Sequence, residues 1–241
     1  MGSVRRVEEA TPELEREEPV IEEIPLRVVV AMLTRNRAKL FKKTVKSLMR
    51  TEMFYELCVA DMGSTDGTEK LVKELGGFVN PRPNPTVGYG MNLIIGKALQ
   101  FGPDIVLFTA DDYEYKRGWL EALTAFWAQA PADVALVSCN LEPDYDWNTV
   151  TGVVDAGGQR AAVRDSVPGA NWSFRASEWG IIGPVADKTG GEDLEICRRL
   201  RSAGRRLCAL DLTKHIGEAQ SSWGNQSHLY ARPLDRKRWG L

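Results

Sequence analysis

Hydrophobic positions along the chain follow two patterns, short continuous apolar runs and longer segments with helical spacing. Residues 26–33 form an almost unbroken apolar run rich in valine, and residues 57–60 and 105–108 repeat the pattern. Runs of this kind are typical of strands buried on both faces of a sheet. Between them, apolar residues recur every three or four positions, as in 40–48, which predicts helices. The alternation predicts an α/β fold with a mostly parallel central sheet flanked by helices.

The same patterns predict the remaining elements. A helix that follows Asp66 is expected to bury Leu71, Val72 and Leu75. Further helices are predicted at 88–99, 119–127 and 192–203, and further strands at 134–138, 171–175 and 206–210. Residues 151–155 and 160–163 are expected to pair as a hairpin.

The two ends of the chain differ from this ordered middle. Residues 1–24 are rich in Glu and contain Pro12 and Pro19, so we expect a flexible acidic arm. Residues 219–241 form a C-terminal tail that ends in a small basic cluster. The folded domain is therefore expected to span 25–218.

Composition narrows the class of protein. A chain of 241 residues with 43% hydrophobic residues has room for one α/β domain with a sizeable core. A net charge of −2 argues against a general nucleic-acid binder. The sequence has no apolar run of about 18 residues or more, so we expect no membrane span. Its four cysteines are scattered without a CxxC pair, which suits reduced thiols and a cytoplasmic location.

Carboxylates follow the predicted strands at the points where those strands end. Asp61 follows the second strand, Asp111 and Asp112 follow the strand at 105–108, and Glu192 and Asp193 begin the last helix. A single acidic residue in such a place is often a turn or a helix cap. Ligands of open parallel sheets, however, bind outside the carboxyl ends of the strands. Three acidic sets at one edge therefore favour a metal and phosphate site.

The chemistry of such a site would suit a divalent cation. Asp111 and Asp112 offer oxygen ligands from a short loop, and a cation there would offset the charge on a departing diphosphate. His215 is a possible third ligand, and an imidazole suits Mn²⁺ better than Mg²⁺. A lone histidine is also often structural, so both interpretations of His215 stay open.

Several motifs together resemble family 2 glycosyltransferases. They are VVVAMLTRNR, CVADMGSTDGT, the Gly-Tyr-Gly-Met-Asn helix start, LFTADD, NWSFRASEWGIIGPV, GGEDLEICRRLRSAGRRL and KHIGE. Their order covers the chain from about residue 26 to 218. The resemblance implies a GT-A fold, a nucleotide-diphospho-sugar donor, a divalent cation (Mn²⁺ or Mg²⁺) and transfer of a hexosyl-type sugar. It also implies a nucleotide-sugar-binding half at 25–130 and an acceptor half at 131–218.

The resemblance assigns roles to individual residues. Asp193 falls on the catalytic base, and Asp111, Asp112 and His215 fall on or near the metal site. Residues expected to contact the donor are Leu33, Thr34, Arg35, Asp61, Asn92 and Asp111. Two positions depart from the family pattern. Met62 replaces the second Asp of the nucleoside-binding pair, and Thr109 replaces the first Asp of the DxD motif.

The assignment of Asp193 also has a physical basis. Its helix is expected to bury Leu194, Cys197 and Leu200, which leaves Asp193 in the first turn, where the helix dipole favours an ionised carboxylate. Such a carboxylate can take the proton of an acceptor hydroxyl as it attacks the anomeric carbon. Attack on the face opposite the nucleotide would invert the configuration.

Two other functions compete with this interpretation. A sugar-phosphate nucleotidyltransferase would carry a Gly-rich loop after the first strand, where this chain has Met32 to Asn36 without a glycine. Met62 and Thr109 also motivate a non-catalytic nucleotide-sugar-binding module, although Asp111, Asp112 and Asp193 argue against it. The sequence leaves the acceptor open among a glycan, a small molecule, a protein and a nucleic-acid base. It does not indicate the oligomeric state.

Overall fold

The computed structural model describes residues 25–80, 82, 85–141, 149–167, 169–217, 237 and 241. The acidic arm 1–24 and nearly all of the tail 219–241 lie outside the described residues. The strands are β1 (Val28–Thr34), β2 (Glu56–Asp61), β3 (Phe78–Val79), β4 (Ile105–Ala110), β5 (Tyr113–Tyr115), β6 (Val134–Ser138), β7 (Val150–Ala156), β8 (Gln159–Arg164), β9 (Asn171–Arg175), β10 (Arg206–Ala209) and β11 (Thr213–His215). The helices are α1 (Ala38–Leu48), α2 (Thr68–Glu74), α3 (Val87–Leu99), α4 (Trp119–Gln129), the 3-10 turn η1 (Ala176–Glu178), α5 (Trp179–Ile182) and α6 (Glu192–Ser202).

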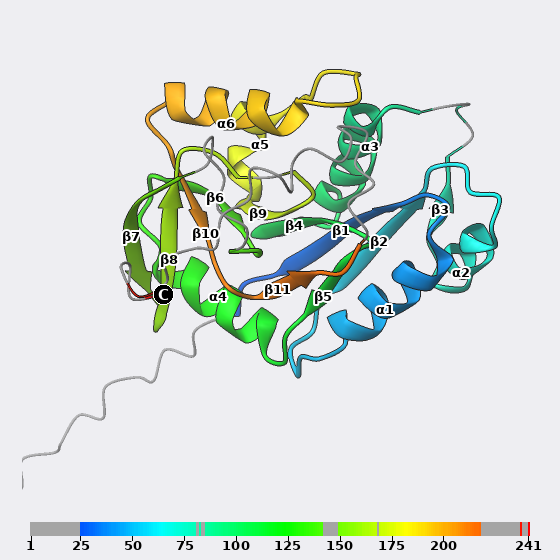
Figure 1. Cartoon of the computed structure of the whole chain (residues 1–241), viewed down its shortest axis with the longest axis horizontal. Coiled ribbons are helices and arrows are strands. Elements are labelled where there is room, and N and C mark those ends of the chain that lie inside the picture. The colour runs from blue at the N-terminus through cyan, green and yellow to red at the C-terminus, as the bar shows by residue number, and fades with distance from the viewer. Residues whose placement is uncertain are drawn as a thin grey trace, which may run out of the picture.

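A nine-stranded sheet forms the centre of the molecule, in the order β3-β2-β1-β4-β9-β6-β10-β8-β7 (Figure 1). Strands β8 and β9 run against the direction that the other strands share. The predicted α/β fold with a mostly parallel sheet is therefore confirmed. The predicted hairpin is present as β7 and β8, which pair antiparallel.

Helices cover both faces of the sheet, and β1 shows why its sequence is apolar at nearly every position. Val28, Val30 and Met32 pack into a core cluster with residues of α1, α2 and α4. Val29 and Ala31 point the other way, into a cluster with residues of α3, α5 and α6. Figure 1 shows α3, α5 and α6 above the sheet and α1 and α4 below it. A strand between two helix layers buries both sets of side chains.

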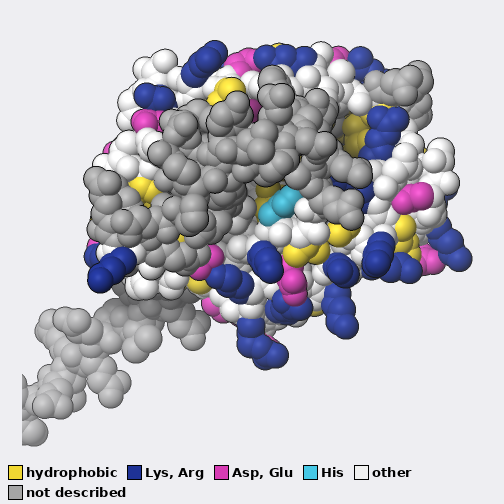
Figure 2. Space-filling view, viewed as in Figure 1, with side chains coloured by type: hydrophobic (Ala, Val, Ile, Leu, Met, Phe, Trp, Pro, Cys, Tyr) yellow, Lys and Arg dark blue, Asp and Glu magenta, His cyan; other side chains and the backbone are white. Residues whose placement is uncertain are grey.

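Helix α1 follows the amphipathic pattern expected from its sequence. Phe41, Thr44 and Leu48 are buried against the sheet. The lysines on the opposite face are exposed, and Figure 2 shows Lys and Arg side chains gathered over this helix. These lysines are Lys39, Lys42, Lys43 and Lys46.

Two predicted core positions are wrong. Leu75 is 45% exposed because α2 ends at Glu74, one residue before it. Leu194 is 36% exposed, and α6 instead buries Ile196, Cys197 and Leu200.

The second, small sheet has a direct bearing on the site. Strand β5 pairs antiparallel with β11, and His215 lies opposite Tyr113. Because Tyr113 directly follows Asp112, this pairing places His215 next to Asp112. Figure 1 shows both strands next to α1 at the front of the molecule.

Two further expectations concern thiols and membranes. All four cysteines are free, and three of them, Cys139, Cys197 and Cys208, are buried. Within the described segments, no helix has the length and apolar character needed to cross a bilayer.

Gly157 provides a test of the packing between α4 and the β7–β8 hairpin. Its φ is +54°, and an added Cβ would lie 1.8 Å from the carbonyl oxygen of Ala125. Gly157→Ala is therefore expected to lower the free energy of unfolding by roughly 2–5 kcal/mol, the sum of left-handed strain and overpacking. Gly158 is the matched control, since its φ is +71° and an added Cβ would meet no atom within 4 Å. Chemical denaturation of both variants measures the difference, and equal losses would show that the contact with Ala125 does not constrain the hairpin.

Candidate active site

The predicted donor and metal residues come from three neighbouring strands. β1 pairs in parallel with both β2 and β4, and the register places Thr34 opposite Asp61 and Leu33 opposite Ala110. Asp111 follows Ala110 directly. The carboxyl ends of these strands therefore bring Leu33, Thr34, Asp61 and Asp111 to one edge of the sheet, as expected for a ligand site of this class of fold.

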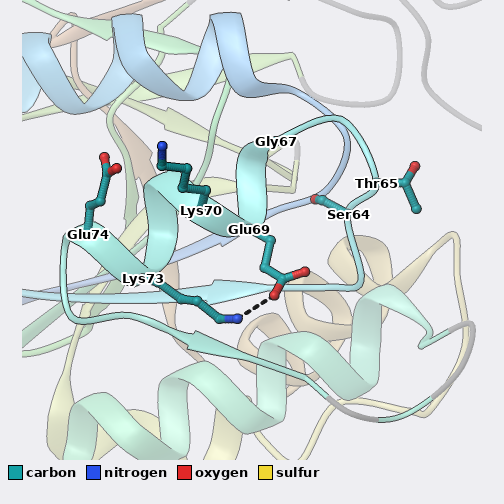
Figure 3. Close-up of a pocket in the computed structure, with 7 residues that line it drawn as sticks. All are labelled: Ser64, Thr65, Gly67, Glu69, Lys70, Lys73 and Glu74. Atoms are coloured by element: carbon teal, nitrogen blue, oxygen red, sulfur yellow. Dashed lines mark hydrogen bonds and ion pairs between the residues drawn. The ribbon is translucent and has the colours of Figure 1, made fainter.

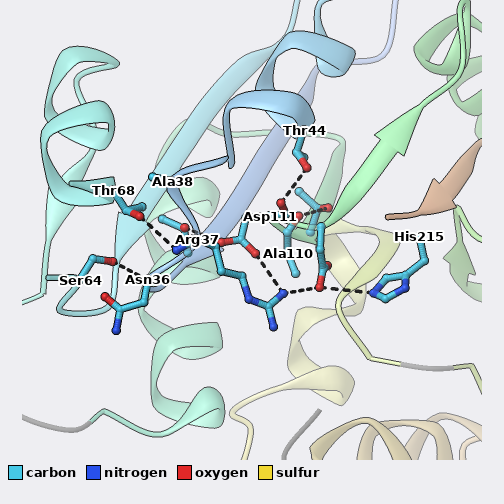
Figure 4. A network of polar contacts seen from close by, with 12 residues as sticks. Asn36, Arg37, Ala38, Thr44, Ser64, Thr68, Ala110, Asp111 and His215 are labelled. Carbon is cyan, nitrogen blue, oxygen red and sulfur yellow. Dashed lines mark hydrogen bonds and ion pairs between the residues drawn. The ribbon is translucent and has the colours of Figure 1, made fainter. Parts of the chain in front are cut away.

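Asp111 is buried and held by hydroxyl groups from two elements. Its side chain is only 4% exposed. The Thr34 hydroxyl donates to Oδ2 of Asp111 at 2.5 Å, and the Thr44 hydroxyl of α1 donates to its carbonyl oxygen at 2.8 Å. These bonds fix the loop that carries both carboxylates (Figure 4).

Asp112 lies against the chain that follows β11. His215 Nε2 is 3.3 Å from Asp112 Oδ2, and the Ile216 N–H donates to the Asp112 carbonyl at 2.8 Å. At Gly217 an added Cβ would lie 2.8 Å from the same Oδ2. Only a glycine lets the backbone pass this close to the carboxylate and the imidazole.

Arg37 is a site residue that the sequence interpretation missed. Its Nη1 donates to Asp112 Oδ2 and lies 3.5 Å from Asp111 Oδ1. Figure 4 shows its guanidinium and the imidazole of His215 reaching toward each other across the loop that follows β4. The sequence did contain a signal for Arg37. It is a basic residue just beyond the first strand, at the sheet edge where the carboxylates lie.

The two carboxyl groups differ in acidity. Burial raises the pKa of Asp111 to about 6, against the hydrogen bond from Thr34 and the charge of Arg37. Burial also acts on Asp112, but the hydrogen bond and charge of His215, together with the charge of Arg37, hold the pKa of Asp112 below its usual value. Asp112 is therefore the more acidic of the pair.

The side chains that could bind a metal at this edge of the sheet suit a hard divalent cation only in part. Within the described ranges, no group of three or more His, Cys, Asp or Glu side chains is arranged to hold a metal ion. Asp112 Oδ2 and His215 Nε2, however, are 3.3 Å apart. Adjacent ligands of an octahedral ion with bonds of ~2.1 Å lie roughly 3 Å apart. Asp112 and His215 therefore fit such an ion, and Asp111 lies beside them.

Asp61 organises the loop after β2. It is fully buried, and its Oδ2 accepts from the N–H groups of Gly63 at 3.2 Å and Ser64 at 3.0 Å. Ser64 Oγ donates to its Oδ1 and accepts from the Asn36 N–H at 2.8 Å. The Asp61 carboxylate thus links the ends of β1 and β2. Its contact with a nucleoside stays a prediction.

Met62 has an apolar environment. It is 6% exposed and belongs to the core cluster below α3. An added Cβ on Gly90 would lie 2.8 Å from Met62 Cε and 2.9 Å from Leu33 Cδ1. Gly90 therefore allows close packing of α3 on these side chains.

An open depression of about 610 Å³ lies beside this loop (Figure 3). Its lining consists of Ser64, Thr65, Gly67, Glu69, Lys70, Lys73 and Glu74. Lys73 and Glu69 form an ion pair across it. None of the predicted catalytic or metal residues lines this depression, so it borders the candidate site without forming its chemical centre.

Glu192 and Asp193 have separate contacts at the start of α6. Glu192 Oε2 accepts from the Gly190 N–H at 2.6 Å, a bond that serves the helix start. Asp193 Oδ2 accepts from the Gly169 N–H at 2.9 Å. The next residue, Ala170, has a φ of +83°, and its carbonyl accepts from the Ala110 N–H at 2.7 Å. A strained turn therefore connects Asp193 to the end of β4, next to Asp111.

The other residues singled out in the sequence have varied surroundings. The Asn92 amide exchanges two hydrogen bonds with the backbone of Val185, at 2.7 and 2.8 Å. Thr109, which replaces a family carboxylate, is buried and accepts from the Tyr115 hydroxyl at 2.9 Å. Arg35 is exposed. Trp172 is 1% exposed and packs on Phe108.

Comparison with known proteins defines the class. The sequence matches the family described as Glycosyl transferase family 2 over residues 29–152, more than half of the chain. The chain therefore belongs to glycosyl transferase family 2, a family of transferases, and it has the GT-A fold expected of them. No curated protein matches the sequence.

Solved structures of glycosyltransferases share this fold. The structure of GalNAc-T7 with UDP, GalNAc and Mn²⁺ matches with a TM-score of 0.66 at 14% identity, over 83% of this chain and 45% of that one. S. aureus TarS 1-349 in complex with UDP-GlcNAc matches with a TM-score of 0.62 at 16% identity, over 82% and 61%. The mannosyltransferase PcManGT from Pyrobaculum calidifontis, in complex with GDP-Man and Mn²⁺, matches with a TM-score of 0.58 at 18% identity, over 83% and 60%. The chain thus spans less than two thirds of each of these structures.

Proposed function

We propose that this chain transfers a sugar from a nucleotide-diphospho-sugar to an acceptor hydroxyl, with inversion and with the help of Mn²⁺ or Mg²⁺. The observation that carries the proposal is the meeting of Asp112 and His215 at 3.3 Å, at the sheet edge where Asp111 also lies. Family membership supports the donor class, and two of the similar structures contain Mn²⁺.

The cation would supply charge stabilisation for the diphosphate leaving group. Asp112 and His215 would hold it. Asp111, which accepts a hydrogen bond from Thr34, would be the second carboxylate beside the diphosphate. Leu33, Arg35, Asp61 and Asn92 belong to the same proposal as donor-binding residues.

Asp193 would act as the base. It would take the proton of the acceptor hydroxyl while that oxygen forms a bond to the anomeric carbon. The bond from the anomeric carbon to the diphosphate breaks in the same step, and its electron pair leaves with the nucleotide. The Gly169 N–H, at 2.9 Å, would keep the Asp193 carboxylate oriented during the transfer.

The first test of this function is donor turnover. UDP- and GDP-sugars would be incubated with the protein and Mn²⁺, Mg²⁺ or EDTA, and release of nucleoside diphosphate would be measured. We expect release with a divalent cation and its loss in EDTA. Release that is unaffected by EDTA would contradict the metal requirement.

Met62 leads to a prediction about the nucleoside. A carboxylate can accept a hydrogen bond from the uracil imide N–H, whereas a thioether is a weak acceptor. We expect selectivity for the base to be looser than, or different from, that of a strict uridine enzyme. Binding of UDP, GDP, CDP and TDP under one metal condition measures this. A preference for UDP above about a hundredfold, or about 2.7 kcal/mol, would show that another group replaces the lost contact.

The acceptor and the compartment belong to the proposal in outline only. A glycan, a small molecule, a protein or a nucleic-acid base modified to carry a hydroxyl would each present a suitable acceptor group. Four free cysteines support a reducing compartment such as the cytoplasm.

A further inference from the structure

Arg37 occupies the position where a cation would meet the site carboxylates. Its Nη1 donates to Asp112 Oδ2 and lies 3.5 Å from Asp111 Oδ1. The two carboxylates are nearly buried, with side chains 4% and 11% exposed. Two adjacent buried carboxylates repel each other, so a nearby positive charge stabilises them. Arg37 provides that charge.

The same oxygen is needed for a metal ion. Asp112 Oδ2 is also the atom that lies 3.3 Å from His215 Nε2, at the spacing of two adjacent metal ligands. A divalent ion bound to Oδ2 and a guanidinium bonded to the same oxygen would repel each other strongly at this distance. The side chain of Arg37 must therefore leave Asp112 when the ion binds.

The surroundings of Arg37 allow that movement. Its side chain is 32% exposed, in contrast to the carboxylates it contacts. Its backbone N–H is held by Thr68 Oγ1 at 3.1 Å, and its carbonyl accepts from the Phe41 N–H at 2.9 Å. The side chain can thus swing while the main chain stays fixed at the start of α1.

We propose that Arg37 is an exchangeable counter-ion, which neutralises Asp111 and Asp112 in the metal-free protein and passes to the diphosphate of the donor when the divalent ion binds. The inference rests on the proposed function, because it needs a metal-dependent nucleotide-sugar donor. A planar guanidinium matches the oxygens of a phosphate group with two parallel hydrogen bonds. Arg37 would therefore be a donor-binding residue as well as a competitor of the metal.

This exchange makes metal and donor binding cooperative. Without a donor, the metal ion must displace Arg37 with no new partner for the guanidinium, so the apparent metal affinity is reduced. With a donor, the diphosphate accepts the released guanidinium. By linkage, the metal then raises the donor affinity by the same factor as the donor raises the metal affinity.

The deciding experiment measures Mn²⁺ binding without nucleotide, by calorimetry or by electron paramagnetic resonance. We expect Arg37→Gln to bind Mn²⁺ about tenfold more tightly than the wild type, which corresponds to about 1.4 kcal/mol. Lys39→Gln is the matched control, since it removes the same charge from an exposed position of α1, two residues further along the chain. It should bind Mn²⁺ as the wild type does. Equal or weaker Mn²⁺ binding by Arg37→Gln would overturn the proposal.

A second measurement guards against a folding defect. Arg37→Gln leaves two carboxylates without their counter-ion, so its melting temperature is expected to fall and to recover more than that of the wild type on addition of Mn²⁺. Arg37→Lys keeps the charge and should bind Mn²⁺ nearly as weakly as the wild type does. A larger Mn²⁺-induced rise in the wild type than in Arg37→Gln would also contradict the exchange.

The third measurement separates this inference from the proposed function. With saturating Mn²⁺, the affinity of Arg37→Gln for the better binder of UDP and GDP should fall about tenfold, because the contact with the diphosphate is lost. If neither the wild type nor Arg37→Gln binds Mn²⁺, with or without nucleotide, the proposed metal-dependent function is wrong, and the proposed exchange is wrong as well. If both bind Mn²⁺ equally well without nucleotide, the exchange alone is wrong.

Discussion

Asp112→Asn is expected to reduce sugar transfer by at least about 10³-fold, because it removes the charge that a divalent ion needs at its ligand oxygen. The Asp112 carboxylate is the group that His215 and Arg37 share. An amide keeps the shape of the side chain and can accept from Arg37, but it binds a hard cation weakly. Asp111→Asn should also abolish transfer. The measurements are transfer rate and Mn²⁺-dependent nucleotide affinity.

Asp133→Asn is the control for this change. Asp133 also pairs with an arginine, Arg206, at 2.6 Å. It precedes β6, however, and so lies at the amino ends of the parallel strands, away from the carboxyl ends that form the site. Its variant should retain activity. The fold of Asp112→Asn should survive, since the backbone bond from Ile216 to the Asp112 carbonyl does not involve the side chain. Unchanged Mn²⁺-dependent nucleotide affinity in both Asp111→Asn and Asp112→Asn would show that the metal site lies elsewhere.

Asp193→Asn is expected to reduce turnover by about 10² to 10⁴-fold, the usual contribution of a positioned proton acceptor. Donor affinity should stay nearly unchanged, because the contacts of Asp193 are with Gly169 and with its own helix. The Asn oxygen can still accept from the Gly169 N–H, so the melting temperature should stay close to that of the wild type. Single-turnover rates with saturating acceptor measure the chemical step.

Glu192→Gln serves as the control for Asp193→Asn. It removes a carboxylate charge from the same helix turn but keeps an oxygen that can accept from Gly190. Its activity should stay within about threefold of the wild type, as expected for a change outside the proton transfer. A purely structural role of Asp193 would give the opposite result, a loss of stability with activity retained. The anomeric configuration of the product tests inversion, and retention would contradict a single displacement.

The sequence was sufficient for elements whose periodicity is long and regular. Continuous apolar runs identified β1, β2, β4 and β6, because a strand covered on both faces has few positions that water can reach. It failed for short elements such as β3, β5, β11 and α5, which span only two to four residues. Such pieces have no period of their own, and long-range pairing determines them. Leu194 shows a similar limit, because both Leu194 and Ile196 fit a helical face that also holds Cys197 and Leu200, and the pattern alone does not decide which of them is buried.

For the site, the sequence by itself placed Asp61, Asp111 and Asp112 at the ends of parallel strands, and parallel strands of one sheet bring those ends together. Only the tertiary structure decided which groups meet them. His215 lies beside Asp112 because β11 pairs with β5 across about a hundred residues of sequence. Arg37 reaches both carboxylates because β1, which it follows, pairs in parallel with β4, which they follow. Buried carboxylates are stabilised by a nearby positive charge. The fold supplies it to Asp111 and Asp112 from Arg37, which is distant in sequence and follows the neighbouring strand β1.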